Sequence, residues 1–203
     1  MNYLAHFHLA GEDPGLITGA LLGDFVKGTV QGETFAAGAN FAALPTRTRE
    51  GILLHRAIDA YFDTLPSVRE FRDLLYPQHR RLHGIALDLL FDHLLSLNWN
   101  RFHDCELDLY SDAISELLLN AETHFSPDAR QFSRRLREHR LLLQYRQPAT
   151  ILLIAGRIAS RWGREQELCG LLESMLADSA TSMNYFERIY PQMQDFACNR
   201  NKT

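Results

Sequence analysis

Residues 51–63, GILLHRAIDAYFD, decide the fold of this chain. Ile52, His55, Ile58 and Asp59 recur here at intervals of three and four, which is the spacing of one face of an α-helix. An imidazole and a carboxylate therefore lie on the apolar face of the predicted helix, where an unpaired carboxylate is strongly unfavourable. Two interpretations are open: the pair is half of a metal site, or it is a buried hydrogen bond that only fixes the helix.

The rest of the chain is predicted to be helical as well. Apolar periods and turn residues place further helices over residues 2–10, 16–26, 67–75, 84–99, 107–123, 127–144, 149–162 and 165–190. Tyr190 and Pro191 are expected to end the last of them. No stretch alternates in the manner of a β-strand. With 46% hydrophobic residues in 203, the chain is expected to form one all-α helical bundle, a single domain over residues 1–203.

Composition excludes several classes of protein. The net charge of −4 and the pI near 6.1 argue against a nucleic-acid binder that relies on general positive charge. No run approaches the ~18 consecutive apolar residues of a membrane span, and no secretion signal opens the chain. The three cysteines, Cys105, Cys169 and Cys198, lack a CxxC spacing and suit reduced thiols. We therefore expect a cytoplasmic protein whose partners include neither nucleic acid nor membrane.

Acids and imidazoles occur in apolar surroundings on other predicted helices too. Asp24 follows a run of apolar residues and has glycines on both sides, which permit close backbone approach. A leucine-rich helix carries Asp92 and His93, with Asp88 one turn earlier. Two buried carboxylates on one helix require a compensating charge, which a divalent cation would supply.

The first predicted helix offers two more imidazoles, His6 and His8. Residues two apart on a helix point about 200° apart, so at most one of them faces a given site. Mixed imidazole and carboxylate ligands favour Mn²⁺, Fe²⁺ or Mg²⁺ over a structural zinc. No Gly-rich phosphate loop, GxSxG motif or Cys-His arrangement indicates nucleophilic catalysis. Hydrolysis by metal-activated water is the chemistry that the sequence favours.

Positive charge is concentrated in one part of the chain. Nine arginines lie in residues 128–164, against Asp128 and Glu138 as the acids. Arginine is suited to phosphate and carboxylate, so this segment is either a basic surface for an acidic partner or a solvated helix face.

Several short motifs, in this order and spacing, resemble the acyl carrier protein phosphodiesterases. They are Asn2-x3-His6-x-His8-Leu9-Ala10, Leu22-x-Asp24-Phe25-Val26-x-Gly28, Gly51-Ile52-x2-His55-Arg56-x2-Asp59-x3-Asp63, Leu87-Asp88-x3-Asp92-His93, Tyr145-Arg146 and Phe186-x3-Tyr190-Pro191. The resemblance covers nearly the whole chain.

This resemblance implies an all-helical enzyme, distantly related to HD-type metal-dependent phosphohydrolases. Such an enzyme removes 4′-phosphopantetheine from the serine of holo acyl carrier protein, a small and strongly acidic substrate, and uses a divalent metal, typically Mn²⁺. The doublet Asp92-His93 reverses the His-Asp order of HD enzymes, so ligands cannot be copied from them directly.

The expected site residues follow from the resemblance and the pattern together. The metal ligands are expected among Asp24, His55, Asp92, His93 and His8. The catalytic residues are expected to be Asp24, His55, Asp59 and Arg56, with Arg56 as a phosphate clamp. Carrier binding is expected at Arg130, Arg134, Arg135, Arg137, Arg140 and Arg146. Two alternatives remain: an HD-like phosphohydrolase for nucleotides, and a non-enzymatic helical binding protein with structural His-Asp pairs. No oligomeric state is predicted.

Overall fold

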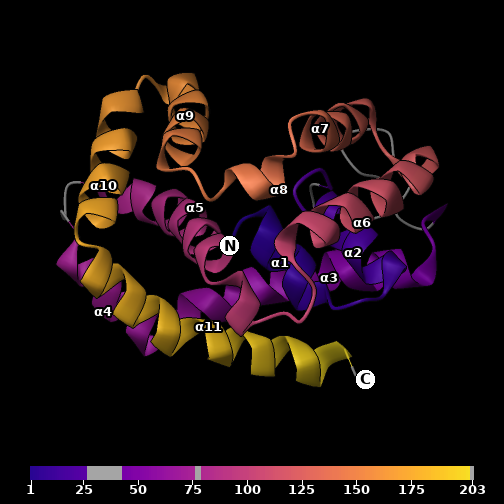
Figure 1. Cartoon of the computed structure of the whole chain (residues 1–203), viewed down its shortest axis with the longest axis horizontal. Coiled ribbons are helices and arrows are strands. Elements are labelled where there is room, and N and C mark those ends of the chain that lie inside the picture. The colour runs from indigo at the N-terminus through magenta and orange to yellow at the C-terminus, as the bar shows by residue number, and fades with distance from the viewer. Residues whose placement is uncertain (27–42, 76–78, 202–203) are drawn as a thin grey trace.

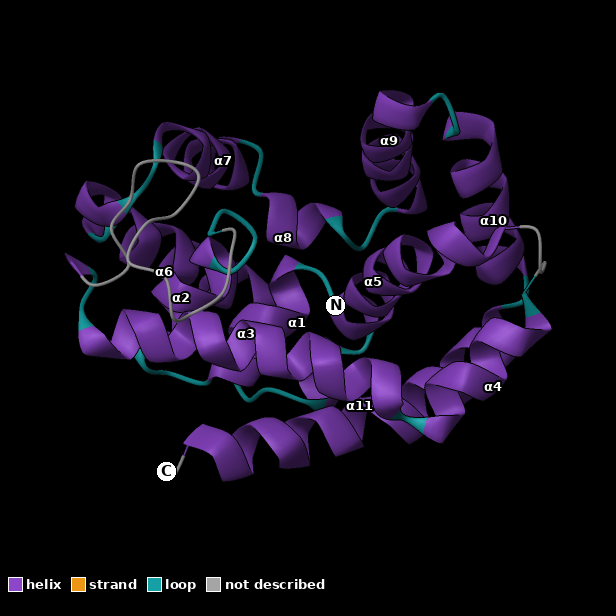
Figure 2. Cartoon of the chain, turned by 180° about the vertical axis from the view of Figure 1, so that it is seen from behind, coloured by secondary structure: helices purple, strands orange, loops and turns teal. Residues whose placement is uncertain are grey.

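The computed structural model describes residues 1–26, 43–75 and 79–201. This part of the chain contains eleven α-helices and no β-strand, which confirms the all-α prediction (Figures 1 and 2). The helices are α1 (Tyr3–Ala10), α2 (Pro14–Leu22), α3 (Thr46–Thr64), α4 (Pro66–Leu74), α5 (Arg80–Leu97), α6 (Leu107–Asn120), α7 (Pro127–Glu138), α8 (Leu141–Gln144), α9 (Pro148–Ala159), α10 (Glu165–Ala177) and α11 (Ser179–Asn201). Gly28 of the second motif lies outside the described residues. None of the described helices is long and apolar enough to cross a membrane.

The short helix α1 lies at the centre of the molecule. It packs against α2, α3, α5 and α11, and both its apolar residues and His6 are buried. Figure 1 shows α9 and α10 at one end of the molecule, α6 and α7 at the other, and α8 between them. Figure 2 shows α11 running along α3 and α4, on the side of the molecule away from α7 and α9.

Helices α2 and α3 meet backbone to backbone at two glycines. A Cβ on Gly19 would come within 2.3 Å of the Thr48 carbonyl oxygen, and one on Gly51 within 2.5 Å of the Leu16 carbonyl oxygen. No larger residue fits at either position without moving a helix. This contact brings the turn after α2, which carries Asp24, beside the middle of α3.

The sequence predicted one helix over the arginine-rich residues 127–144, and the structure shows that this was wrong. Helix α7 ends at Glu138, and Arg140 adopts a left-handed conformation with φ of 46° before α8 begins. Its guanidinium binds Asp108 and Asp112 of α6 at 2.6 and 3.0 Å, which holds the chain reversal in place. A left-handed residue ends a helix because its φ cannot continue the right-handed hydrogen-bond pattern.

The prediction of one helix over residues 165–190 was also wrong. The chain breaks at Asp178, whose carboxylate accepts a hydrogen bond from the Thr181 amide at 3.2 Å and caps α11. Helix α11 then continues through Pro191 to Asn201. Burial of Met193 and Ala197 beyond the proline outweighs the backbone hydrogen bond that the proline cannot donate.

Candidate active site

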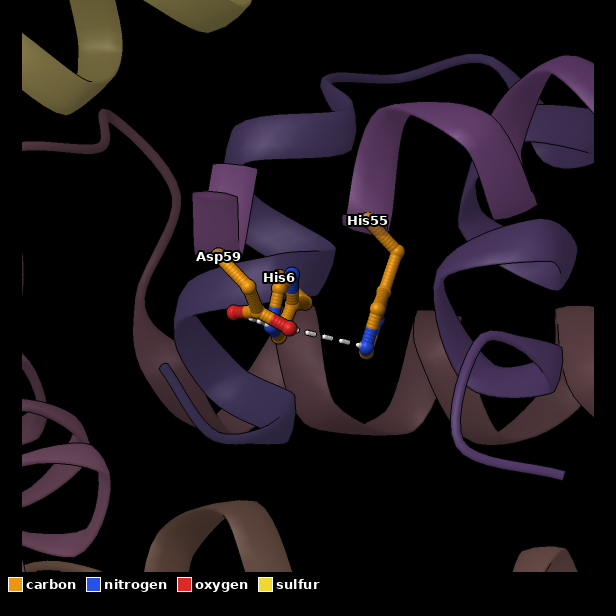
Figure 3. A group of neighbouring side chains, drawn as sticks. All are labelled: His6, His55 and Asp59. Atoms are coloured by element: carbon orange, nitrogen blue, oxygen red, sulfur yellow. Dashed lines mark ion pairs between the residues drawn. The ribbon is translucent and has the colours of Figure 1, made fainter. Parts of the chain in front are cut away.

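Three side chains from α1 and α3 converge at the centre of the molecule. His6 comes from α1, and His55 and Asp59 lie one turn apart on α3; their possible ligand atoms are all within 4.8 Å of one another (Figure 3). The two imidazole rings stack at a centroid distance of 3.8 Å. Asp59 places Oδ1 3.1 Å from His6 Nε2 and Oδ2 3.4 Å from His55 Nε2. The carboxylate therefore faces both rings at once.

The backbone of α2 fixes which nitrogen of His55 carries the proton. His55 Nδ1 lies 2.9 Å from the Ala20 carbonyl oxygen, which can only accept, so Nδ1 donates and, in the neutral ring, Nε2 holds the lone pair. That lone pair faces carboxylate oxygens of Asp59 at 3.4 Å and Asp24 at 3.5 Å. Acceptors facing one another repel, and a proton or a cation between them removes the repulsion. Metal-binding histidines are oriented in this way by a backbone carbonyl on the other nitrogen.

The ring of His6 is buried but is not fixed by hydrogen bonds to the described residues. It is buried, and neither ring nitrogen makes a hydrogen bond within the described structure, although Nε2 approaches Asp59. Burial and the neighbouring His55 lower the pKa of His6 to about 4, against the opposing effect of Asp59. The ring is therefore neutral at pH 7, which is the form that binds a metal.

The two carboxylates beside His55 are ionised. Burial alone would raise the pKa of Asp24, but His55, His6 and Tyr3 outweigh it and lower the pKa. Burial would also raise the pKa of Asp59, but His6, the Met1 amino group and His55 hold it far below the usual value. Both carboxylates keep about half of their side-chain surface exposed, so the cluster opens to solvent on their side.

The structure already places one positive group beside this cluster. The amino group of Met1 lies 2.7 Å from Asp88 Oδ1 and 3.1 Å from Asp59 Oδ1. Burial lowers the pKa of this amino group, but the two carboxylates more than offset that and raise it to about 11. A cation is therefore favourable between Asp59 and Asp88.

Asp92 and His93 are not brought into the cluster. Asp92 accepts hydrogen bonds from the Leu4 and Ala5 amides at 2.8 and 3.1 Å, in the first turn of α1. The positive N-terminal end of α1 thus compensates the charge of Asp92. The sequence had led us to expect a divalent cation in this role. Burial still raises the pKa of Asp92 to about 7. His93 donates from Nδ1 to the Tyr145 carbonyl oxygen at 2.7 Å.

His8 lies on the other side of α1 from His6, as two residues at this spacing must. Its Nε2 donates to the Phe102 carbonyl oxygen at 3.1 Å, so Nδ1 accepts from the Tyr190 hydroxyl at 2.7 Å. Both nitrogens are occupied, and the structure does not bring His8 to the cluster. Sequence reasoning left His6 open and chose His8, because α1 is buried on nearly all sides and its pattern does not distinguish the two faces.

Two further residues hold Asp24 against His55. The Arg56 guanidinium donates to the Val26 carbonyl oxygen at 2.7 Å, two residues beyond Asp24. Gly23 packs on the His55 ring, where a Cβ would come within 2.4 Å of the ring Cγ. The turn after α2 is thus fixed from both sides.

Most of the arginines expected to bind a partner are engaged within the chain. Arg134 lies 3.6 Å from Glu122, and Arg140 binds the two aspartates of α6. Arg130 donates to backbone carbonyls at the end of α6, and Arg146 donates from Nε to the Ser96 carbonyl oxygen at 3.2 Å. Of that set, only Arg135 and Arg137 make neither an ion pair nor a side-chain hydrogen bond with another described residue.

Comparison with known proteins identifies the family. A family model described as acyl carrier protein phosphodiesterase matches residues 1–193. The chain belongs to the acyl carrier protein phosphodiesterase family. The match confirms the resemblance drawn from the short motifs, and with it the predicted enzyme class, a phosphodiester hydrolase.

Curated members of the acyl carrier protein phosphodiesterase family resemble the chain along its length. An acyl carrier protein phosphodiesterase of Klebsiella pneumoniae subsp. pneumoniae is 31% identical over 201 residues, 98% of this chain and 99% of its own. One of Escherichia coli O6:K15:H31 has the same identity and coverage. One of Yersinia pestis is 39% identical over 120 residues, 58% of this chain and 57% of its own. No solved structure matches the chain.

Proposed function

We propose that this protein hydrolyses the phosphodiester bond between 4′-phosphopantetheine and the serine of holo acyl carrier protein, and that it does so with a divalent cation. The family match over residues 1–193 supports the substrate. The cluster of His6, His55 and Asp59 supports the chemistry, because two imidazoles and an ionised carboxylate are a donor set for Mn²⁺, with Mg²⁺ or Fe²⁺ as alternatives.

The donors fit a cation in a specific respect. His6 is a buried imidazole with no hydrogen bond among the described residues, and His55 turns Nε2 toward two carboxylates. His6, His55 and Asp59 would hold the ion, and Asp24 is close enough to His55 to join them. A bound cation would polarise the phosphate and lower the pKa of a water molecule. Asp92, His93 and His8 were also expected as ligands, but their hydrogen bonds favour structural roles.

The chain's own groups would orient the reactants. Asp24 is ionised and half exposed at the open side of the cluster, so its free carboxylate surface can accept a proton from water. Arg56 carries a positive charge on the same turn of α3 as His55, where it would balance part of the charge of a bound phosphodiester. The backbone bond of Ala20 keeps the proton of His55 on Nδ1 throughout.

Substrate comparison tests this proposal. The purified protein with Mn²⁺ is given holo acyl carrier protein, a cyclic nucleotide and bis(4-nitrophenyl) phosphate, each with the Asp59→Asn variant in parallel. We expect phosphopantetheine release from the carrier at a kcat/KM far above that for the nucleotide, and loss of activity on all three substrates in the variant. Efficient nucleotide cleavage without carrier cleavage would replace the proposal with the nucleotide phosphohydrolase. No hydrolysis of any substrate would favour a binding protein.

A further inference from the structure

The chain contains one long segment without any acidic residue. No Asp or Glu occurs in residues 139–164, which include α8, α9 and five arginines. The next acids, Glu165 and Glu167, begin α10, and Glu167 is already bound to Arg164 and His79. Helix α9 is therefore a surface element with positive charge and no negative charge of its own.

The exposed side of α9 and of the 3₁₀ helix that follows it, Ser160–Trp162, combines arginines with apolar side chains. Leu153, Arg157 and Arg161 recur at intervals of four and are all exposed, and Trp162 follows directly. Leu153 is 55% and Trp162 58% exposed, among the most exposed large apolar residues described. Neither Arg157 nor Arg161 forms an ion pair with another described residue. We call Leu153, Arg157, Arg161 and Trp162 the α9 stripe.

The α9 stripe begins beside helix α5, whose Asp92 is bonded to the first turn of α1. His93 of α5 donates to the Tyr145 carbonyl oxygen, and Arg146 donates to that of Ser96, so the chain entering α9 is bonded to α5 just after Asp92. At 1.5 Å per residue, α9 rises about 17 Å from Pro148 to Ala159. A small protein domain is about 30 Å across. A partner of that size that contacts the α9 stripe also extends to the start of α9, where the chain is bonded to α5.

The surface of α7 is less suited to an acidic partner than that of α9. Arg134 and Arg140 are neutralised by Glu122, Asp108 and Asp112, and Asp128 and Glu138 lie on α7 itself. An acidic protein approaching α7 would meet these carboxylates, and like charges at an interface are unfavourable.

We propose that the α9 stripe is the docking surface for the acidic acyl carrier protein. This inference rests on the proposed function for the identity of the partner. Arg157 and Arg161 contact carboxylates of the carrier, while Leu153 and Trp162 bury apolar surface against it. The carrier then lies with one end toward the junction of α8 and α9, which His93 joins to α5 and, through Asp92, to the first turn of α1 that carries His6.

Binding of the apo carrier protein tests the surface independently of catalysis, because the apo form has no bond to cleave. Trp99 is 1% exposed, so quenching by iodide reports mainly on Trp162. With a carrier that lacks tryptophan, we expect docking to protect Trp162 from iodide, and the dissociation constant to rise with salt. Arg157→Glu and Arg161→Glu should each weaken binding about tenfold or more.

Matched variants make the test specific. Arg69→Glu on α4 and Arg135→Glu on α7 make the same charge change at exposed arginines elsewhere, and we expect less than about a twofold effect from either. Unchanged binding in the two α9 variants, or a loss confined to Arg135→Glu, would overturn the inference. No binding of wild-type protein to the carrier at low salt would also overturn it.

Turnover of holo carrier protein separates this inference from the proposed function. We expect Arg157→Glu to raise KM for the carrier and to leave hydrolysis of bis(4-nitrophenyl) phosphate unchanged. Normal carrier KM in this variant would reject the α9 stripe and leave the proposed function standing. If the wild-type protein binds the carrier through the α9 stripe but releases no phosphopantetheine, the proposed function is rejected and the docking surface stands.

Discussion

Gly23 lies so close to His55 that a Cβ at position 23 would come within 2.4 Å of the imidazole Cγ. The ring is thereby held between the turn after α2 and the ring of His6, which stacks on it at 3.8 Å. Its Nδ1 is bonded to Ala20, so neither a rotation nor a shift of the ring is free. The glycine thus fixes the direction of the Nε2 lone pair.

Replacing Gly23 tests whether that direction matters. Its φ of −51° suits any residue, so Gly23→Ala is a steric change only. We expect the methyl group to displace His55 and lower kcat by about 100-fold, with the helical circular dichroism spectrum retained. Gly84→Ala is the control, because no described atom lies within 4 Å of its added Cβ, and it should keep full activity. Equal activity of the two variants would show that His55 tolerates movement.

Substitutions of the two histidines of α1 should have different effects on Mn²⁺ affinity. His6→Asn should weaken Mn²⁺ binding at least about 100-fold, because the nitrogens of His6 have no hydrogen-bond partner in the described part of the chain. His8→Asn should leave Mn²⁺ affinity unchanged and lower the unfolding free energy by about 1–3 kcal/mol, because it breaks the bonds to Tyr190 and Phe102. Calorimetric titration and urea denaturation measure the two quantities. Loss of metal affinity in His8→Asn alone would reverse the assignment.

Asp92→Asn distinguishes a ligand from a helix cap. The carboxylate accepts from two amides of α1 with its two oxygens, and the amide side chain of asparagine has only one oxygen. We expect a loss of about 1–2 kcal/mol in unfolding free energy and a change in turnover of at most about fivefold. A fall in turnover of several orders of magnitude in a folded protein would instead support the ligand role predicted from the sequence.

His8 should make stability depend on pH. Burial lowers its pKa from 6.5 to about 4, with the Phe102 carbonyl opposing and His103 adding to the shift. The unfolded chain therefore binds a proton below about pH 6.5 that the folded chain refuses until about pH 4. His8 contributes a loss of unfolding free energy as pH falls through this window, at most about 3 kcal/mol, and nothing above it. Urea denaturation from pH 7.5 to 4 in a chelator should show a smaller fall for His8→Gln; an equal fall would contradict this.

Much of the fold follows from local pattern. The intervals of three and four predicted α3 and the shared face of His55 and Asp59, and apolar context marked Asp24. Helix ends were less predictable because distant contacts decide them. Arg140 reverses the chain through two aspartates of α6, and Pro191 stays within a helix because apolar residues beyond it are buried.

The composition of the site was only partly predictable. A buried carboxylate such as Asp92 implies a compensating charge, but the sequence does not show that backbone amides of α1 supply it. The choice between His6 and His8 depends on which side of α1 meets α3. That is a property of packing, and a helix apolar on every side carries no pattern for it.

The central claim, that the cluster of His6, His55 and Asp59 uses a divalent cation to cleave the holo carrier, is tested most directly by the intact mass of that carrier. The holo carrier is incubated with three preparations of the protein: as purified, after treatment with a chelator, and after Mn²⁺ has been added back. Asp59→Asn is compared with Asp63→Asn, an exposed aspartate one turn further along α3 that pairs with Arg72. We predict loss of the phosphopantetheine mass only with the metal present, in wild type and Asp63→Asn but not in Asp59→Asn. Complete conversion in excess chelator, or by Asp59→Asn, would contradict the account.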